Sequence, residues 1–171
     1  VSWRIDERLY GAPIDPHRAS EDPQKRLVSG PLDGDGRRSI YIKVTIMEPA
    51  RLLATFNAPD PKIPTGQRDV SNTPVQSLTL LNDLFVQEQA AHWSARLLQQ
   101  PQADVDSRLR EMFNTGLCRP ATQLELIRWR AAVYDLAALH DVASTAVMSS
   151  DVVWQDIAHA FFNLKEFLYN R

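Results

Sequence analysis

The chain has 171 residues, and its 19 basic and 21 acidic side chains give a formal net charge of -2. This length, with 44% hydrophobic residues, is typical of one globular domain that buries roughly 70% of its unfolded surface. The near-neutral charge argues against nucleic acid or an anionic membrane as the partner. The single cysteine, Cys118, excludes an intrachain disulfide, a cysteine zinc cluster and a haem attachment motif, and no apolar run approaches the roughly 18 residues of a membrane span.

The N-terminal part of the chain, over residues 10–38, is punctuated by proline and glycine and contains few apolar residues. This composition predicts a long loop region. Its segment Asp33-Gly34-Asp35-Gly36 looks like half of a calcium loop, but Arg37 and Arg38 follow at once and would repel a cation. We therefore interpret the segment as a tight turn.

A strand is predicted over Ser39–Ile46, because Ile40, Ile42, Val44 and Ile46 alternate with polar residues. A single strand leaves its backbone groups unpaired. We therefore expect a pairing partner from the N-terminal loop, from a segment upstream of this chain or from a second molecule.

The rest of the chain has helical periodicity. We predict helices from Pro49 to about Ala58, from Thr73 to about Gln100, over Asp104–Leu117, from Thr122 to about Ala138 and from Asp151 to about Leu168. The predicted fold is mainly α, a helical bundle of about five helices with one short β-strand and a long Pro/Gly-rich N-terminal loop region. We expect one domain over residues 1–171, with a loop-and-strand arm at 1–48 and the bundle at 49–171.

Helical spacing also predicts which side chains are buried and how the helices are capped. Thr73 with Gln76, and Thr122 with Glu125, have the spacing of capping boxes, and Gly116 suits a C-terminal cap. The predicted buried stripes are Leu78, Leu81, Phe85, Val86, Ala90, Trp93 and Leu97; Val105, Leu109 and Phe113; Leu124, Ile127, Ala131, Tyr134 and Ala138; and Val153, Ile157, Phe161, Leu164 and Leu168.

The histidines lie in no recognisable catalytic context. Glu88 and His92 are four residues apart on one helix face, but a third metal ligand at helical spacing is absent, so we interpret them as an exposed pair. His140 precedes Asp141 near a helix end, where the helix dipole favours a positive imidazole. The chain has no Gly-x-Ser-x-Gly motif to support a serine triad, and no catalytic residue is nominated.

The start of the helix that follows Thr73 is the candidate ligand-binding site. Free N–H groups at a helix start, flanked by hydroxyls, an amide and an arginine, suit a carboxylate, sulfate or phosphate. Alternatively, a carboxylate of the protein already occupies this position, which makes it an internal structural clamp. The candidate residues are Arg37, Arg38, Tyr41, Arg68, Ser71, Asn72, Thr73 and Gln76.

Several segments in order resemble one family. They are Gly-Pro-Leu-Asp-Gly-Asp-Gly-Arg37-Arg38-Ser39-Ile40-Tyr41, Leu-Leu-Ala-Thr-Phe56-Asn57-Ala-Pro59, and Arg68-Asp-Val-Ser71-Asn72-Thr73-Pro74-Val-Gln76, followed by Cys118-Arg119-Pro120-Ala-Thr122-Gln-Leu-Glu125-Leu and Asn163-Leu-Lys-Glu166-Phe167. The chain resembles the C-terminal part of the planctomycete-type domain of unknown function fifteen fifty-three, which is found in large proteins with a cytochrome c-like domain. The resemblance covers nearly the whole chain.

Two positions depart from the family pattern. Trp3 stands where the family has a turn-forming glycine, so we expect the chain to begin at an internal boundary, as a fragment, a processed product or a shortened relative. Asn57 stands where the family usually has an aspartate before Ala-Pro, which weakens a catalytic carboxylate at this position.

The resemblance implies an extracytoplasmic location, with polysaccharide or electron-transfer chemistry nearby. The first hypothesis is a scaffold or interaction module that binds other domains or chains of its parent assembly. The alternative is a polysaccharide-active or redox enzyme domain that binds anionic carbohydrate near residues 68–73. We expect no cofactor in this chain, and whether it is an enzyme stays open.

Overall fold

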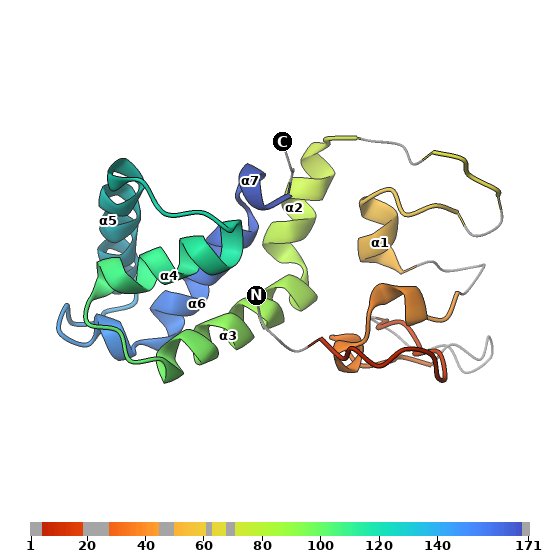
Figure 1. The fold of residues 1–171 in the computed structure, drawn as a ribbon, viewed down its shortest axis with the longest axis horizontal. Helices are drawn as coiled ribbons and strands as arrows, with labels where there is room; N and C mark the ends of the chain where they lie inside the picture. The colour runs from red at the N-terminus through yellow and green to blue at the C-terminus, as the bar shows by residue number, and fades with distance from the viewer. Residues whose placement is uncertain (1–4, 19–27, 45–49, 61–62, 68–70, 169–171) are drawn as a thin grey trace. The chain divides into compact units, whose positions relative to one another are not determined.

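The computed structural model describes residues 5–18, 28–44, 50–60, 63–67 and 71–168. The chain divides into two compact units, one spanning Arg4–Phe85 and the other holding the helices from Val86 onward. The predicted helical bundle is confirmed, since helices dominate the described residues (Figure 1). The boundary between the units follows Phe85. The expected single domain, with an arm at 1–48 and a bundle at 49–171, stays a prediction. Within the described ranges, no helix is both long and apolar enough to cross a membrane.

The Arg4–Phe85 unit consists of loops and short helices. It contains the 3-10 turns η1 (Gly34–Gly36) and η2 (Ser39–Tyr41), and the helices α1 (Arg51–Thr55) and α2 (Pro74–Asn82), which pack against each other. The tight turn is confirmed in η1, where the Asp33 carboxylate accepts a hydrogen bond from the backbone N–H of Asp35 at 3.0 Å. Asp35 itself adopts the left-handed conformation, with φ of 53°.

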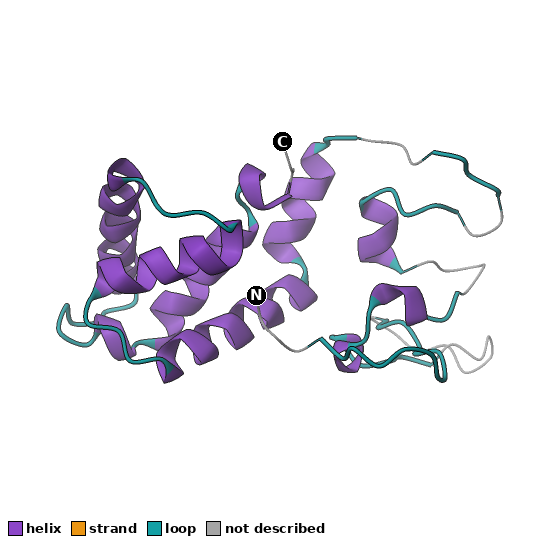
Figure 2. Ribbon diagram, in the orientation of Figure 1, coloured by secondary structure: helices purple, strands orange, loops and turns teal. Residues whose placement is uncertain are grey.

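The strand predicted over Ser39–Ile46 is wrong for its described part, and Thr45 and Ile46 lie outside the described residues. Figure 2 accordingly shows helices and loops, but no strand, in the described segments. The N-terminal loop does supply the partner, through isolated parallel bridges from Asp6 to Arg37 and from Ile14 to Ile42. Asp6 and Ile14, on the N-terminal side of the bridges, are eight positions apart, whereas Arg37 and Ile42 on the other side are only five apart. A regular ladder cannot join segments of unequal length, so no ladder forms between the two bridges, and η2 lies in the shorter segment.

The unit from Val86 onward is the bundle proper. Its helices are α3 (Leu84–Gln99, from Val86), α4 (Val105–Leu117), α5 (Gln123–Leu139), α6 (Asp151–Phe162) and α7 (Lys165–Leu168), with the 3-10 turn η3 (Val147–Ser149) before α6. Helix α5 runs across α4 and α6 and packs on both, and α7 packs on α4 and α6 (Figure 1).

Two predicted helices are each broken once. The helix predicted from Thr73 to Gln100 stops at Asn82, because the backbone of Asp83 is extended. The Asp83 carboxylate accepts a hydrogen bond from the Phe85 N–H at 2.9 Å, and this bond caps the start of α3. Short aspartate and asparagine side chains compete with the helical backbone in this way. The last predicted helix breaks at Asn163, whose side-chain amide donates to the His159 carbonyl at 2.9 Å.

Aromatic rings form the centre of the bundle. Phe161 contacts Trp93, Phe113 and Trp129, with ring centroids 5.6, 5.1 and 4.3 Å away. The three rings come from α3, α4 and α5, so one side chain of α6 holds all four helices together. The predicted burial of Trp93, Phe113 and Phe161 is confirmed.

Other predicted contacts are wrong. Gly116 is not the helix cap, since Cys118 occupies that position with φ of 53°. A Cβ at Gly116 would lie 3.0 Å from the Trp93 ring, so this glycine makes room for the indole. Several side chains predicted as buried are instead exposed, because each lies opposite the face that packs: Leu78 and Leu81 in α2, and Leu124, Ile127, Ala131, Tyr134 and Ala138 in α5. The buried residues of α5 are Leu126, Val133 and Ala137.

Candidate functional site

The start of α2 has the capping box that its sequence predicts. The Thr73 hydroxyl accepts a hydrogen bond from the Gln76 backbone N–H at 3.4 Å, and the Gln76 side-chain oxygen accepts one from the Thr73 N–H at 3.2 Å. Pro74 occupies the first turn, where its lack of an N–H has no cost. Two of the backbone groups that an anion would need are therefore occupied by protein atoms.

Gln76 also ties α2 to α1. Its side-chain NH₂ donates to the Thr55 carbonyl and to the Ser71 hydroxyl, both at 3.1 Å. With its oxygen in the capping box, the buried amide uses both hydrogens and its oxygen on protein partners. The internal-clamp hypothesis expects a carboxylate of the protein at this position, whereas the described bonds are made by the Gln76 amide with Thr73, Ser71 and Thr55. Asp69 lies outside the described residues, so a carboxylate clamp stays a prediction.

Asn57 belongs to the same hydrogen-bond network. Its side-chain NH₂ donates to the Ser71 hydroxyl at 2.6 Å. The residue follows α1 in the left-handed conformation, with φ of 56°, which asparagine adopts at less cost than most residues. Asn57 therefore joins the end of α1 to the segment before α2, and this geometry gives a structural reason for an amide at this position.

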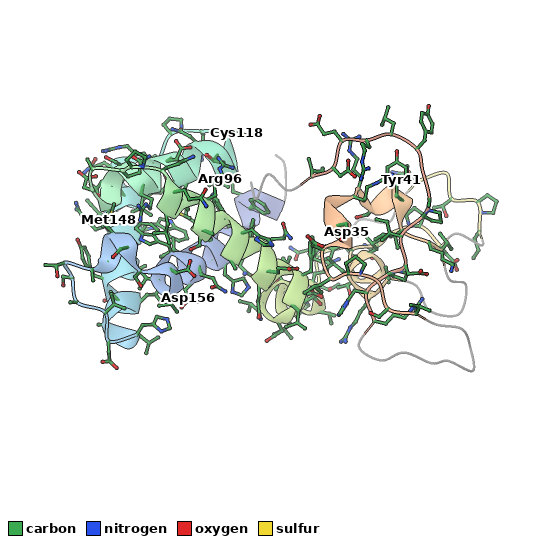
Figure 3. All side chains as sticks on the ribbon, turned by 90° about the horizontal axis from the view of Figure 1, so that it is seen from below. Asp35, Tyr41, Arg96, Cys118, Met148 and Asp156 are labelled. Atoms are coloured by element: carbon green, nitrogen blue, oxygen red, sulfur yellow. The ribbon has the colours of Figure 1, made fainter. Side chains whose placement is uncertain are left out.

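Arg37 and Tyr41 hold the N-terminal loop. The Arg37 guanidinium lies 4.1 Å from the centroid of the Tyr41 ring and donates to the Tyr10 carbonyl at 2.7 Å. The hydroxyl of Tyr41, a residue labelled in Figure 3, accepts a hydrogen bond from the Tyr10 N–H at 2.9 Å. A carboxylate oxygen of Asp6 lies 3.9 Å from Nε of Arg37. Hydrogen bonds from Arg8 lower the pKa of the Asp6 carboxyl to about 2. All these polar groups serve the contact between two loops.

The eight candidate residues do not form one site. The structure joins Arg37 with Tyr41, and separately joins Ser71 and Thr73 with Gln76. No described hydrogen bond or ion pair links the two groups. Arg38 and Asn72 are exposed. Arg68 lies outside the described residues. The binding of an anion by these eight residues stays a prediction.

The hydrogen bonds of Gln76, which clamp α2 to α1, predict the effect of Gln76→Leu. This change removes the buried bonds to Thr55, Ser71 and Thr73, and should cost about 1–3 kcal/mol of stability. Asn72→Ala, at an exposed neighbouring position, should change stability by less than about 0.5 kcal/mol. Denaturant titration of both variants checks the difference. Equal stabilities for the two variants would contradict the clamp.

The most strongly bonded polar group of the described chain lies elsewhere, at Arg119 between α4 and α5. Its guanidinium donates to both Glu125 oxygens, at 2.6 and 3.0 Å, and to both Glu166 oxygens at 2.6 Å. It also lies over the Phe113 ring at 5.2 Å. Two bidentate carboxylates on one arginine form a fixed planar contact that joins the start of α5 to α7.

Electrostatics at Arg119 follow from these contacts. Hydrogen bonds from Arg119, aided by those from Thr122, lower the pKa of the Glu125 carboxyl to about 2. Hydrogen bonds to Glu166 and Glu125 raise the pKa of Arg119. Arg119 and Glu125 lie in one of the segments that resemble the family, and Glu166 lies in another. The structure brings these two segments into contact, which neither segment predicts by itself.

Two polar contacts in the bundle could not be read from sequence. His140 pairs with Asp156 of α6 at 2.7 Å. The buried Arg108 donates to the Met148 carbonyl at 2.7 Å and lies 4.7 Å from the Trp154 ring, and burial lowers its pKa (Figure 3 labels Met148).

Glu88 and His92, 3.8 Å apart, are partly buried rather than fully exposed. No group of three or more His, Cys, Asp or Glu side chains that could hold a metal occurs among the described residues.

Comparison with known proteins yields one match. No curated protein and no solved structure matches the chain. A family model, PSD1, described as a protein of unknown function (DUF1553), matches residues 1–133. The match includes both candidate groups around α2 and η2 and the first motif at Arg119. Because it covers more than half of the 171 residues, the chain belongs to the DUF1553 family.

Proposed function

We propose that the chain is a scaffold or interaction module of a larger extracytoplasmic assembly that contains a cytochrome c-like domain. The observation that carries the proposal is the outer face of α2. Val75, Leu78 and Leu81 are exposed on this helix, whereas Gln76 and Leu80 are buried. Large apolar side chains gathered on one helix face mark a surface that contacts another protein.

The polar groups of the chain support the same proposal. Arg119 is bonded to protein carboxylates, and Arg37 to a protein carbonyl and an aromatic ring. Gln76 is bonded on both atoms of its amide. These side chains join one segment of the chain to another. A structural role of this kind is what we expect of polar residues in a scaffold. The extracytoplasmic, cytochrome c-linked setting comes from the family resemblance.

Titration of the chain with a cytochrome c-like domain from a DUF1553 protein tests the proposal. Isothermal titration calorimetry should detect binding, and Leu78→Glu should weaken it by about tenfold or more, because a charge replaces an apolar contact. Asn114→Glu adds the same charge at an exposed position of α4, outside this face, and should leave the affinity within about threefold. If no heat is released, or if both variants bind as the wild type does, the proposal fails.

A second candidate function is an enzyme domain that binds anionic polysaccharide. The exposed Arg38 and Asn72 favour it, since these two candidate residues are accessible to a ligand from solvent. Thermal shift against sulfated and carboxylated oligosaccharides distinguishes the two functions. Ligand at about 100 times its dissociation constant adds roughly 2.7 kcal/mol of stability, so a true site gives a clear rise in melting temperature. The absence of any shift would refute the enzyme.

A further inference from the structure

Helix α5 has two apolar faces. One face, with Leu126, Val133 and Ala137, is buried in the bundle. The other is open to solvent: Leu124, Ile127 and Tyr134 are 56, 48 and 42% exposed, and Ala131 and Ala138 lie beside them. The buried face alone packs α5 on α4 and α6, so the second apolar face has no use within the described bundle. The second face is therefore available to another molecule.

The spacing of the open face identifies the kind of partner. Its residues follow one another at steps of three, four, three and four: Leu124, Ile127, Ala131, Tyr134 and Ala138. This is the seam of a coiled coil, in which apolar residues repeat every 3.5 positions and pack against a second helix. In heptad terms, Leu124, Ala131 and Ala138 are a positions, and Ile127 and Tyr134 are d positions. The seam fits an α-helix.

The charges beside the seam select a second copy of α5 in the antiparallel direction. Antiparallel helices place an a position against a d position. When Ile127 faces Ala138 of the partner subunit, Arg128 lies beside Asp135 of the partner subunit, and the two-fold symmetry forms this ion pair twice. A shift of one heptad one way places Arg128 against its own copy, and the opposite shift does the same to Asp135. Only the middle register brings opposite charges together.

Two further observations favour this arrangement. Arg128 and Asp135 are exposed and make no ion pair with any described residue, whereas Arg130, which a parallel pair would use, is bonded to Asp106 at 3.1 Å. In the middle register two layers place a large side chain against alanine, Ile127 against the partner's Ala138 and Tyr134 against the partner's Ala131, whereas Leu124 lies at the end of the seam, opposite a position beyond the end of α5. Such layers allow two helices to approach closely without overpacking.

We propose that α5 pairs two copies of this chain through this antiparallel seam. The proposal rests on the proposed function in one respect, since it gives the interaction module a partner, the chain itself. It concerns a different surface from α2. If the chain dimerises but does not bind the cytochrome c-like domain, the pairing through α5 stands and the proposed interaction module is refuted. If the chain stays monomeric but binds the domain, the module stands and the pairing is refuted.

Analytical ultracentrifugation of the full chain over a concentration series tests the pairing. The wild type should shift from monomer to dimer with rising concentration. Ile127→Glu should raise the dissociation constant by at least about tenfold, because it puts a charge in the seam. Val152→Glu, on the exposed side of α6, is the matched control and should leave the constant unchanged. A wild type that stays monomeric throughout, or an Ile127→Glu variant that still dimerises, overturns the proposal.

A charge exchange tests the register. Asp135→Arg alone places arginine beside Arg128 of the partner subunit and should weaken the dimer by about threefold to tenfold. The double variant Arg128→Asp with Asp135→Arg restores opposite charges and should recover the wild-type constant. A parallel pair would not recover, since the new arginine would face Arg130. Recovery supports the antiparallel seam and its absence overturns it, with far-UV circular dichroism showing that each variant is folded.

Discussion

Phe161→Ala is expected to lower the free energy of unfolding of the bundle by about 3–5 kcal/mol. The ring is fully buried and contacts Trp93, Phe113 and Trp129, which come from three other helices. The truncation removes the apolar burial of the ring and its edge-to-face contacts, and leaves a cavity that the neighbouring indoles cannot fill without moving. Because domains of this size are stable by only about 5–15 kcal/mol, the variant should lose a large share of its stability.

Thermal unfolding followed by near-UV circular dichroism measures this effect, because the tryptophans of the core provide the signal. For a unit of this size, each kcal/mol corresponds to about 4–8 °C, so the melting temperature should fall by well over 10 °C. Val152→Ala, at an exposed position of the same helix, should leave it nearly unchanged. A small loss for Phe161→Ala would mean that this ring is not the centre of the core.

Helix positions and caps could be predicted because they depend on neighbours in the sequence. Helix α4 has the predicted residues within one position, and both capping boxes, at Thr73 and Thr122, are present. The breaks at Asp83 and Asn163 were missed, since an aspartate or asparagine continues a helix at one position and ends it at another, according to which backbone group its side chain reaches.

The packed face of α5 could not be predicted, because the helix has two apolar stripes. The stripe through Leu124, Ile127 and Tyr134 has the more regular spacing and larger side chains, yet the stripe through Val133 and Ala137 is buried. Periodicity shows that a face is apolar, but only the positions of α4 and α6 decide which face they cover. The same limit applies to Leu78 and Leu81 in α2.

The candidate site was predicted where its contacts are local. The Thr73–Gln76 pair is three residues apart and followed from spacing. The bonds from Arg37 to Tyr10 and from Gln76 to Thr55 join residues 27 and 21 positions apart, and the Arg119–Glu166 contact joins residues 47 positions apart. Contacts between residues so far apart in the sequence leave no pattern in residue spacing. The sequence therefore does not distinguish an arginine that binds a carboxylate of the protein from an arginine that binds a ligand.

Arg119→Met should lower the free energy of unfolding at pH 7 by about 1–2 kcal/mol, since charge-assisted hydrogen bonds to two carboxylates are lost at a partly exposed position. Methionine keeps the unbranched stem over Phe113, so most of the loss reflects charge and hydrogen bonding. Arg110→Met, on the exposed side of α4, provides the control and should have little effect.

The dependence on pH separates this ion pair from simple packing. The pKa of Glu125 is about 2 in the folded protein, below its ordinary value of 4.5, so the carboxylate contributes stability above pH 4.5 and loses it as the pH falls toward 2. The stability difference between wild type and Arg119→Met should therefore be constant from pH 7 to about 5 and shrink below that. Urea titrations at pH 7, 5, 4 and 3 measure it. A difference that stays constant down to pH 3 would show that Arg119 stabilises the bundle by packing alone, and that the joining of α5 to α7 does not depend on its charge.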